Sequence, residues 1–259
     1  MTANTPSVPD HTGCACGSVA RRPTRRRVLS MPAKAGALAA LGAGVDAVLP
    51  PRPARAAEAT TTRLQPEAAI TRLLAGNDRY AGAKPDVCAE NLARIWHATE
   101  SGQTPFAAVL SCADSRVPVE LVFDEGVGQV FVARVAGNIA SPDVIATLEY
   151  GVAVLGISAI MVLGHGNCGA VAATIARKAA PGQISSLYAF IRPAVEEAGR
   201  DLDAAIKLNA VMQARLLGQA SPVLAGAIGT GRLAIPAAYY DVKNGRVSLL
   251  EGGPARRPG

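Results

Sequence analysis

Three short, mostly apolar runs in the middle of the chain show no regular alternation of apolar and polar residues. They are 105–111 (PFAAVLS), 129–135 (QVFVARV) and 157–164 (ISAIMVLG). Runs of this length without polar alternation are typical of strands that are covered on both faces. The pattern therefore predicts three strands buried in the centre of a sheet.

Helical periodicity separates and surrounds these runs. Pro66 stands at the first turn of one predicted helix, and Ser141 precedes Pro142 as the N-cap of another. The last part of the chain reads as a hairpin that turns at Asn244-Gly245. The predicted helices cover 66–81, 89–101, the segment 141–156 (SPDVIATLEYGVAVLG) from Pro142 on, 168–179, 186–198 and 202–217.

Strands that alternate with helices predict an α/β fold. We expect a single domain with a mostly parallel central sheet flanked by helices, and an antiparallel edge hairpin near the C-terminus. Pro236 lies in the first strand of that hairpin and indicates an edge or a bulge there, because proline cannot donate to a sheet ladder.

Charge is distributed unevenly over the 259 residues. The formal net charge of +6 comes from the first 56 residues, which hold eight basic and two acidic side chains, whereas residues 57–259 hold 18 of each. A neutral body gives no reason to expect nucleic acid as a partner.

The basic leader resembles a twin-arginine export signal. TRRRVLS (24–30) precedes an Ala/Gly-rich apolar run at 33–49, and ARAA offers small residues for cleavage near Ala56/Ala57. We expect 1–56 to be the signal and 57–259 the catalytic domain, located in the periplasm or outside the cell. The alternatives are a basic tail on a cytosolic protein and an uncleaved membrane anchor, but the run is short and polar for a membrane span.

The cysteines fall into three groups. Cys14 and Cys16 would leave with the signal, and Cys88 is interpreted as a lone free thiol. Cys112 and Cys168 stand in LSCADSR (110–116) and LGHGNCGAV (163–171). In an oxidising compartment these two could form a disulfide, which is the simplest alternative to a metal site.

The metal interpretation uses more of the neighbouring residues. Cys112 and His165 follow two predicted parallel strands, whose carboxyl ends meet at one edge of the sheet, and Cys168 lies three residues after His165. Two thiolates and an imidazole are a zinc ligand set that leaves the fourth position open. The sequence therefore favours a catalytic zinc site over a disulfide.

Two other kinds of site share part of this pattern. Gly164, Gly166 and Gly169 match the G-x-G-x-x-G turn that binds dinucleotides, but no strand and no carboxylate follow before Glu196. A thiol phosphatase loop needs a longer span than the four positions from Cys112 to Arg116. We rank both below a zinc site.

Asp114 and Arg116 alternate with Cys112 along CADSR, so all three can point the same way. Zinc bound by two thiolates makes its water only moderately acidic, and a nearby carboxylate is needed to orient the zinc-bound hydroxide. Arg116 can hold Asp114 ionised and away from the metal. This predicts Asp114 and Arg116 as a catalytic pair.

The motif Cys112-x-Asp114-x-Arg116 followed by His165-x-x-Cys168-Gly169 resembles the β-class carbonic anhydrases, and the similarity extends from about residue 66 to about residue 250. The resemblance implies one Zn²⁺ per subunit on Cys112, His165 and Cys168, and reversible hydration of carbon dioxide to bicarbonate and a proton. It also implies a homodimer or a dimer-based oligomer. Substrate-binding positions implied by the motifs are Gln103, donated across the dimer interface, and Phe131, Tyr150 and Gly169.

Some family members switch the aspartate onto zinc and carry tryptophan three positions before the first ligand. This chain has Val109 there, which places it with the non-switching members. His97 is interpreted as a helix-surface residue. Two alternatives remain open: hydrolysis of carbon disulfide or carbonyl sulfide at the same site, and a zinc protein without turnover.

Overall fold

The computed structural model describes residues 63–86, 96, 99–100, 102–177 and 179–253. The predicted signal at 1–56 and its cleavage point near Ala56/Ala57 lie outside these residues, as do Cys14, Cys16, Cys88 and His97. Along the described stretches, no helix combines the length and the hydrophobicity needed to cross a bilayer.

The centre of the fold is a five-stranded sheet with the order β2-β1-β3-β4-β5. β1 pairs in parallel with β2 and with β3, β3 pairs in parallel with β4, and only β4 and β5 are antiparallel. This confirms the mostly parallel sheet and the hairpin at its edge. The strands are β1 (Ala107–Ser111), β2 (Val130–Arg134), β3 (Ile160–His165), β4 (Ala237–Asp241) and β5 (Arg246–Leu250).

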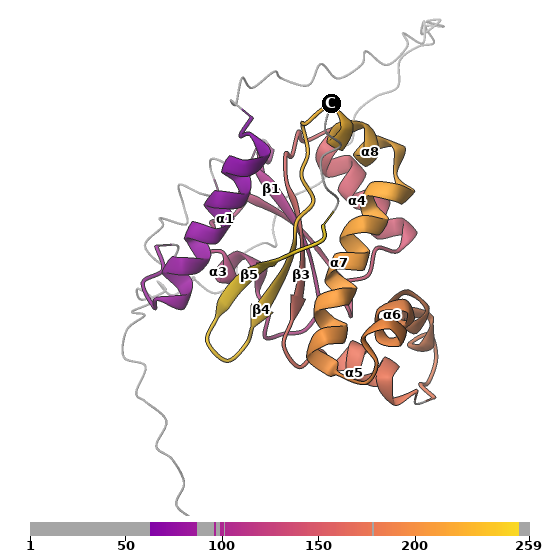
Figure 1. The fold of residues 1–259 in the computed structure, drawn as a ribbon. Helices are drawn as coiled ribbons and strands as arrows, with labels where there is room; N and C mark the ends of the chain where they lie inside the picture. The colour runs from indigo at the N-terminus through magenta and orange to yellow at the C-terminus, as the bar shows by residue number, and fades with distance from the viewer. Residues whose placement is uncertain (1–62, 87–95, 97–98, 101, 178, 254–259) are drawn as a thin grey trace, which may run out of the picture. The chain divides into compact units, whose positions relative to one another are not determined.

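Helices cover both faces of the sheet (Figure 1). The described helices are α1 (Pro66–Ala81), α3 (Val119–Val122), α4 (Pro142–Ala153), α5 (Gly169–Ala176), α6 (Ser185–Ala198), α7 (Leu202–Ala220) and α8 (Pro222–Gly229). Ala108 and Leu110 of β1 pack in the cluster that includes residues of α4, α7 and α8, whereas Ala107 and Val109 pack in the cluster that includes α1 and α3. Every residue of β1 is buried, which explains why its sequence shows no polar alternation.

Local signals predicted most elements well. α1 occupies 66–81 with Pro66 in its first turn, and Ser141 is the N-cap of α4, although its side chain accepts no capping hydrogen bond from a backbone N–H and its hydroxyl donates instead to the Asp143 carboxylate. The hairpin turns between Asp241 and Arg246, and the Gly245 φ of +75° suits glycine. These elements formed as the local sequence predicted.

Three features differ from the sequence-based expectation. β4 lies between β3 and β5 and begins at Ala237, so Pro236 precedes an internal strand and is not part of an edge strand. α3 and α8 were not predicted; α3 is a single turn, and α8 follows α7 directly at Ser221, whose side chain accepts from the Leu224 N–H. Short apolar helices such as these carry too few residues for a clear period.

Asn77 on α1 is a buried amide whose hydrogen-bond partners lie in other elements of the fold. Its side chain is 2% exposed; Nδ2 donates to the carbonyls of Val122 and Gly245 at 3.0 and 2.8 Å, and Oδ1 accepts from the Val247 N–H at 2.7 Å. One buried amide therefore joins α1, the end of α3 and the β4–β5 hairpin.

Replacing Asn77 with leucine should lower the free energy of unfolding by about 3 kcal/mol, because one buried and two half-buried backbone groups lose their partner. Chemical denaturation measures this change. The neighbouring exposed substitution Asp78→Ala, which removes only a surface ion pair with Arg246, is the control and should change stability by less than about 1 kcal/mol. Equal losses in both variants would contradict this role for Asn77.

Candidate metal centre

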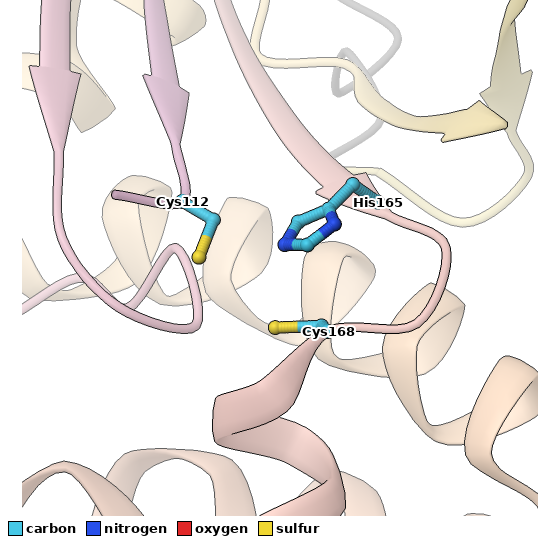
Figure 2. Close-up of side chains that lie close together, drawn as sticks. All are labelled: Cys112, His165 and Cys168. Atoms are coloured by element: carbon cyan, nitrogen blue, oxygen red, sulfur yellow. The ribbon is translucent and has the colours of Figure 1, made fainter. Parts of the chain in front are cut away.

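Three potential metal ligands from distant parts of the chain meet at the carboxyl edge of the sheet. Cys112 follows β1 directly, His165 ends β3, and Cys168 is the N-cap of α5. One ligand atom from each lies within 4.8 Å of the others, and all three residues are buried. Figure 2 shows the two sulfur atoms and the imidazole ring turned toward a common space. Both cysteines are free thiols, so the disulfide alternative is not formed.

The orientation of His165 fits a metal ligand. Its Nδ1 lies 3.0 Å from the carbonyl oxygen of Gly166. A carbonyl can only accept, so Nδ1 carries the hydrogen and Nε2 keeps its lone pair. Nε2 is buried and has no hydrogen-bond partner among the described residues. A lone buried acceptor beside two thiols is the environment that a thiophilic cation such as zinc satisfies.

The two thiols influence each other strongly. Hydrogen bonding from Cys168 is the main cause that lowers the pKa of Cys112, and the Gly137 N–H adds to it. The same interaction raises the pKa of Cys168, and burial raises it further. The two thiols thus share one proton, which a cation between the two sulfurs would replace.

Asp114 and Arg116 form a close pair at the entrance to the cluster. Arg116 Nε and Nη2 donate to the two carboxylate oxygens of Asp114 at 2.9 and 2.7 Å, and the Arg116 backbone N–H donates to Oδ1 at 3.0 Å. These bonds hold the pKa of the Asp114 carboxyl well below its usual range. Arg116 Nη2 also donates to the Asn167 carbonyl, which joins this pair to the loop that carries His165 and Cys168.

The carboxylate of Asp114 lies near the cluster without being part of it. Its Oδ2 is 3.8 Å from His165 Nε2, too long for a hydrogen bond. Because Arg116 binds both carboxylate oxygens, Asp114 is oriented by a partner outside the cluster. The predicted proximity of Asp114, Arg116 and the three ligands is therefore present in the fold.

Arg134 was not singled out from the sequence and holds the site loop from β2. Its Nε donates to the Cys112 carbonyl at 3.0 Å, and its Nη2 donates to the Asp114 carbonyl at 2.6 Å. The sequence offered one signal, because Arg134 lies near the carboxyl end of a predicted strand, where Cys112 and His165 also follow theirs.

The other predicted site residues do not gather around the cluster of the same chain. Gln103 is exposed and precedes β1, whereas Cys112 follows it, and four steps along a strand separate the two ends by about 13 Å. Phe131 lies on the outer strand β2 and pairs with Ala108 of β1. Its ring centroid is 6.4 Å from that of Tyr150 on α4. Gly169 is the exception, since it begins α5 directly after Cys168.

The topology also argues against the dinucleotide-binding site considered from the glycine pattern. After β3 and α5, the chain forms α6, α7 and α8 before it returns to the sheet as β4. The short strand–helix–strand unit that carries an acidic residue for a ribose is therefore absent from this part of the described chain. The residues between the glycines, His165 and Cys168, are those that converge with Cys112.

Comparison with known proteins agrees with this geometry. The family profile described as "Carbonic anhydrase" matches residues 107–247. The chain is 32% identical to "Carbonic anhydrase 2" of Mycobacterium tuberculosis over 72% of its length and 93% of that protein. It is 34% identical to "Carbonic anhydrase" of Mycolicibacterium smegmatis over 71% of its length and 93% of that protein.

Solved structures give the same result. A tetrameric β-carbonic anhydrase from Sordaria macrospora is 26% identical with a TM-score of 0.59, covering 72% of this chain and 98% of the other. The Coccomyxa β-carbonic anhydrase in complex with acetazolamide is 29% identical with a TM-score of 0.56, covering 70% and 86%. From the matched profile, the relatives and the Cys-His-Cys cluster, this chain belongs to the β-class carbonic anhydrase family and has carbonic anhydrase activity.

Proposed function

We propose that the chain catalyses the reversible hydration of carbon dioxide at one Zn²⁺ ion held by Cys112, His165 and Cys168, with Asp114 and Arg116 as the catalytic pair. The observation that carries the proposal is the convergence of three buried ligand atoms within 4.8 Å beside an ion pair that points into the same edge of the sheet. Three protein ligands leave a fourth position for a small molecule.

Bound zinc would supply a Lewis acid that lowers the pKa of a water molecule and makes it nucleophilic at neutral pH. The protein groups then have separate tasks. The Asp114 carboxylate accepts a hydrogen bond from the nucleophile, and Arg116 keeps that carboxylate ionised and turned in one direction. The amides at the start of α5, next to Gly169, favour negative charge at the site.

The ion pair favours catalysis over a closed structural site. If Asp114 occupied the fourth zinc position permanently, the two hydrogen bonds from Arg116 would compete with the metal for the same oxygens. Carbon disulfide and carbonyl sulfide remain alternative substrates for the same ligands. The close relatives named carbonic anhydrases support carbon dioxide for this chain.

A dimer is part of the proposal, because Gln103, Phe131 and Tyr150 lie away from the metal cluster of their own chain. β2 is the outer strand of the sheet at one edge, and Val130, Phe131 and Val132 are only partly buried there. Tyr150 is 49% exposed beside Phe131. We propose that a second copy covers this edge and that Gln103, Phe131 and Tyr150 of each subunit serve the metal site of the other.

Export by the twin-arginine route to the periplasm or the cell exterior remains a proposal from the leader sequence alone. The basic segment TRRRVLS (24–30) and the small residues before Ala57 support it. The twin-arginine route transports folded proteins, which suits a domain that takes up its metal before crossing the membrane.

Zinc-loaded chain should hydrate carbon dioxide rapidly in stopped-flow assays with a pH indicator, and Cys112→Ser should lose both zinc and activity because a neutral hydroxyl is a poor zinc ligand. Zinc content is measured on the same samples. Full zinc occupancy in Cys112→Ser would contradict its role as a ligand. A fully loaded, inactive wild type that hydrolyses carbon disulfide would favour the alternative substrate.

Asp114→Asn should keep zinc and lose roughly 100-fold or more in kcat. The amide is uncharged and has one acceptor oxygen, whereas the carboxylate has two, which together accept from Arg116 and from the nucleophile. Arg116→Ala should also lose activity while it retains zinc, since Asp114 loses the bonds that orient it. Stopped-flow kinetics and metal analysis check both variants. Near wild-type activity in either would contradict the catalytic pair.

Contribution of Gln103 across a dimer predicts complementation. Gln103→Ala and Cys112→Ala are each expected to be weak or inactive as homodimers. Co-expressed with two different tags and purified as a mixed dimer, they should regain about half of the wild-type activity, because one of the two sites then has an intact Cys112 and an intact partner Gln103. A mixed dimer no more active than the Gln103→Ala protein would contradict the shared site.

A further inference from the structure

Two carboxamides are buried on one face of α7, where the rest of the helix packs with apolar side chains. Asn209 is 0% exposed and Gln213 is 2% exposed, and they stand one helical turn apart. A buried amide that loses its hydrogen bonds costs about 1–3 kcal/mol, whereas an apolar residue at the same place would not. Both amides therefore need hydrogen-bond partners inside the protein.

Both amides bind the loop that joins β2 to α4. Asn209 Nδ2 donates to the Gly137 carbonyl at 2.9 Å, and Gln213 Oε1 accepts from the Ala140 N–H at 2.8 Å. Gln213 Nε2 donates to Asn209 Oδ1 at 3.3 Å and to the Phe190 carbonyl at 3.0 Å. Gln213 thus fixes the orientation of Asn209, and together they attach α7 to this loop at two points.

Gly137 is the residue through which this attachment reaches the metal cluster. Its N–H donates to Cys112 Sγ at 3.3 Å, while its carbonyl receives the bond from Asn209. The Gly137 φ is +78°, and a Cβ atom there would lie 2.6 Å from Ile191 Cδ1. The backbone at Gly137 is therefore held in one conformation from both sides, with its N–H aimed at the sulfur.

We propose that Asn209, oriented by Gln213, is a positioning residue that directs the Gly137 N–H onto Cys112 Sγ and so sets the geometry and donor strength of this thiolate toward the metal. The inference rests on the proposed function, in which Cys112 is a zinc ligand. A hydrogen bond to a ligating thiolate withdraws electron density from sulfur and fixes its direction. With two thiolates on one ion, such a bond also preserves positive charge on the metal.

If Asn209 had only a structural role, its replacement would lower stability without changing the binding of the metal. Asn77 is an equally buried amide with three hydrogen bonds to backbone groups, but those groups belong to α3 and the β4–β5 hairpin and do not touch the cluster. Replacing Asn77 or Asn209 should therefore lower the stability of the fold by similar amounts. Only the replacement of Asn209 should change the affinity for the metal.

The test compares Asn209→Leu with Asn77→Leu in the full chain. Zinc affinity is measured by competition with a chromophoric chelator, and cobalt-substituted protein gives the thiolate-to-metal charge-transfer band. Asn209→Leu should raise the zinc dissociation constant about ten-fold, because Cys112 Sγ loses the hydrogen bond that fixes its direction toward the metal. It should also shift the band to longer wavelength, because a thiolate without its hydrogen bond is a stronger donor. Asn77→Leu should leave both values near those of the wild type.

Gln213→Met keeps the approximate size of the side chain but removes the hydrogen bond that Gln213 donates to Asn209. It should shift the zinc dissociation constant and the cobalt band in the same direction as Asn209→Leu but by less, since Asn209 itself remains. Wild-type values in both Asn209→Leu and Gln213→Met would overturn the inference, and so would equal changes in Asn77→Leu. A wild type that shows no thiolate-to-cobalt band would instead contradict the zinc assignment itself, which separates the two proposals.

A measurement on the wild type needs no variant to fold. In protein loaded with ¹¹³Cd, a hydrogen bond from Gly137 N–H to metal-bound Cys112 Sγ should give scalar coupling between that amide proton and the metal. Coupling at Gly137 supports the inference. Its absence, with coupling to the Cys112 β-protons present, would overturn the inference while leaving Cys112 as a ligand.

Discussion

The parallel pairing of β1 with β3 is the constraint on which the site depends. Ser111 is paired with Leu163, so the chain leaves β1 at Cys112 beside the last residues of β3, Gly164 and His165. Both strands are buried along their whole length, and a slip by one residue would turn every apolar side chain to the opposite face. Core packing thus fixes the register, and the register brings Cys112 and His165 together.

The same edge of the sheet gathers the groups that control the cluster. β2 contributes Arg134, which binds the carbonyls of Cys112 and Asp114, and the loop after β2 contributes the Gly137 N–H. Helix α5 begins at Gly169, so the tight turn after β3 places Cys168 opposite His165. Each of these groups lies at a strand end or a helix start, where backbone donors and acceptors are free to bind side chains.

Local patterns were sufficient for much of the fold. Unbroken apolar runs identified β1, β2 and β3, and proline at a first turn identified α1 and α4. The short helices α3 and α8 were missed because so few residues show no reliable period. Pro236 was misjudged because the sequence does not say where a strand begins; β4 starts one residue later and lies inside the sheet.

The sequence by itself determined the chemical identity of the site: two thiols, one imidazole and an Asp–Arg pair, at the ends of predicted strands. Only the tertiary structure decided that His165 keeps Nε2 free by bonding Gly166, that Arg134 and Gly137 contact Cys112, and that Asn209 lies behind Gly137. The physical reason is range. Periodicity and capping depend on neighbours a few residues apart. Apart from the His165–Gly166 bond, which joins adjacent residues, these hydrogen bonds span 22, 25 and 72 positions. The pairing of β2 with β1 and the packing of α7 bring the groups within reach of each other.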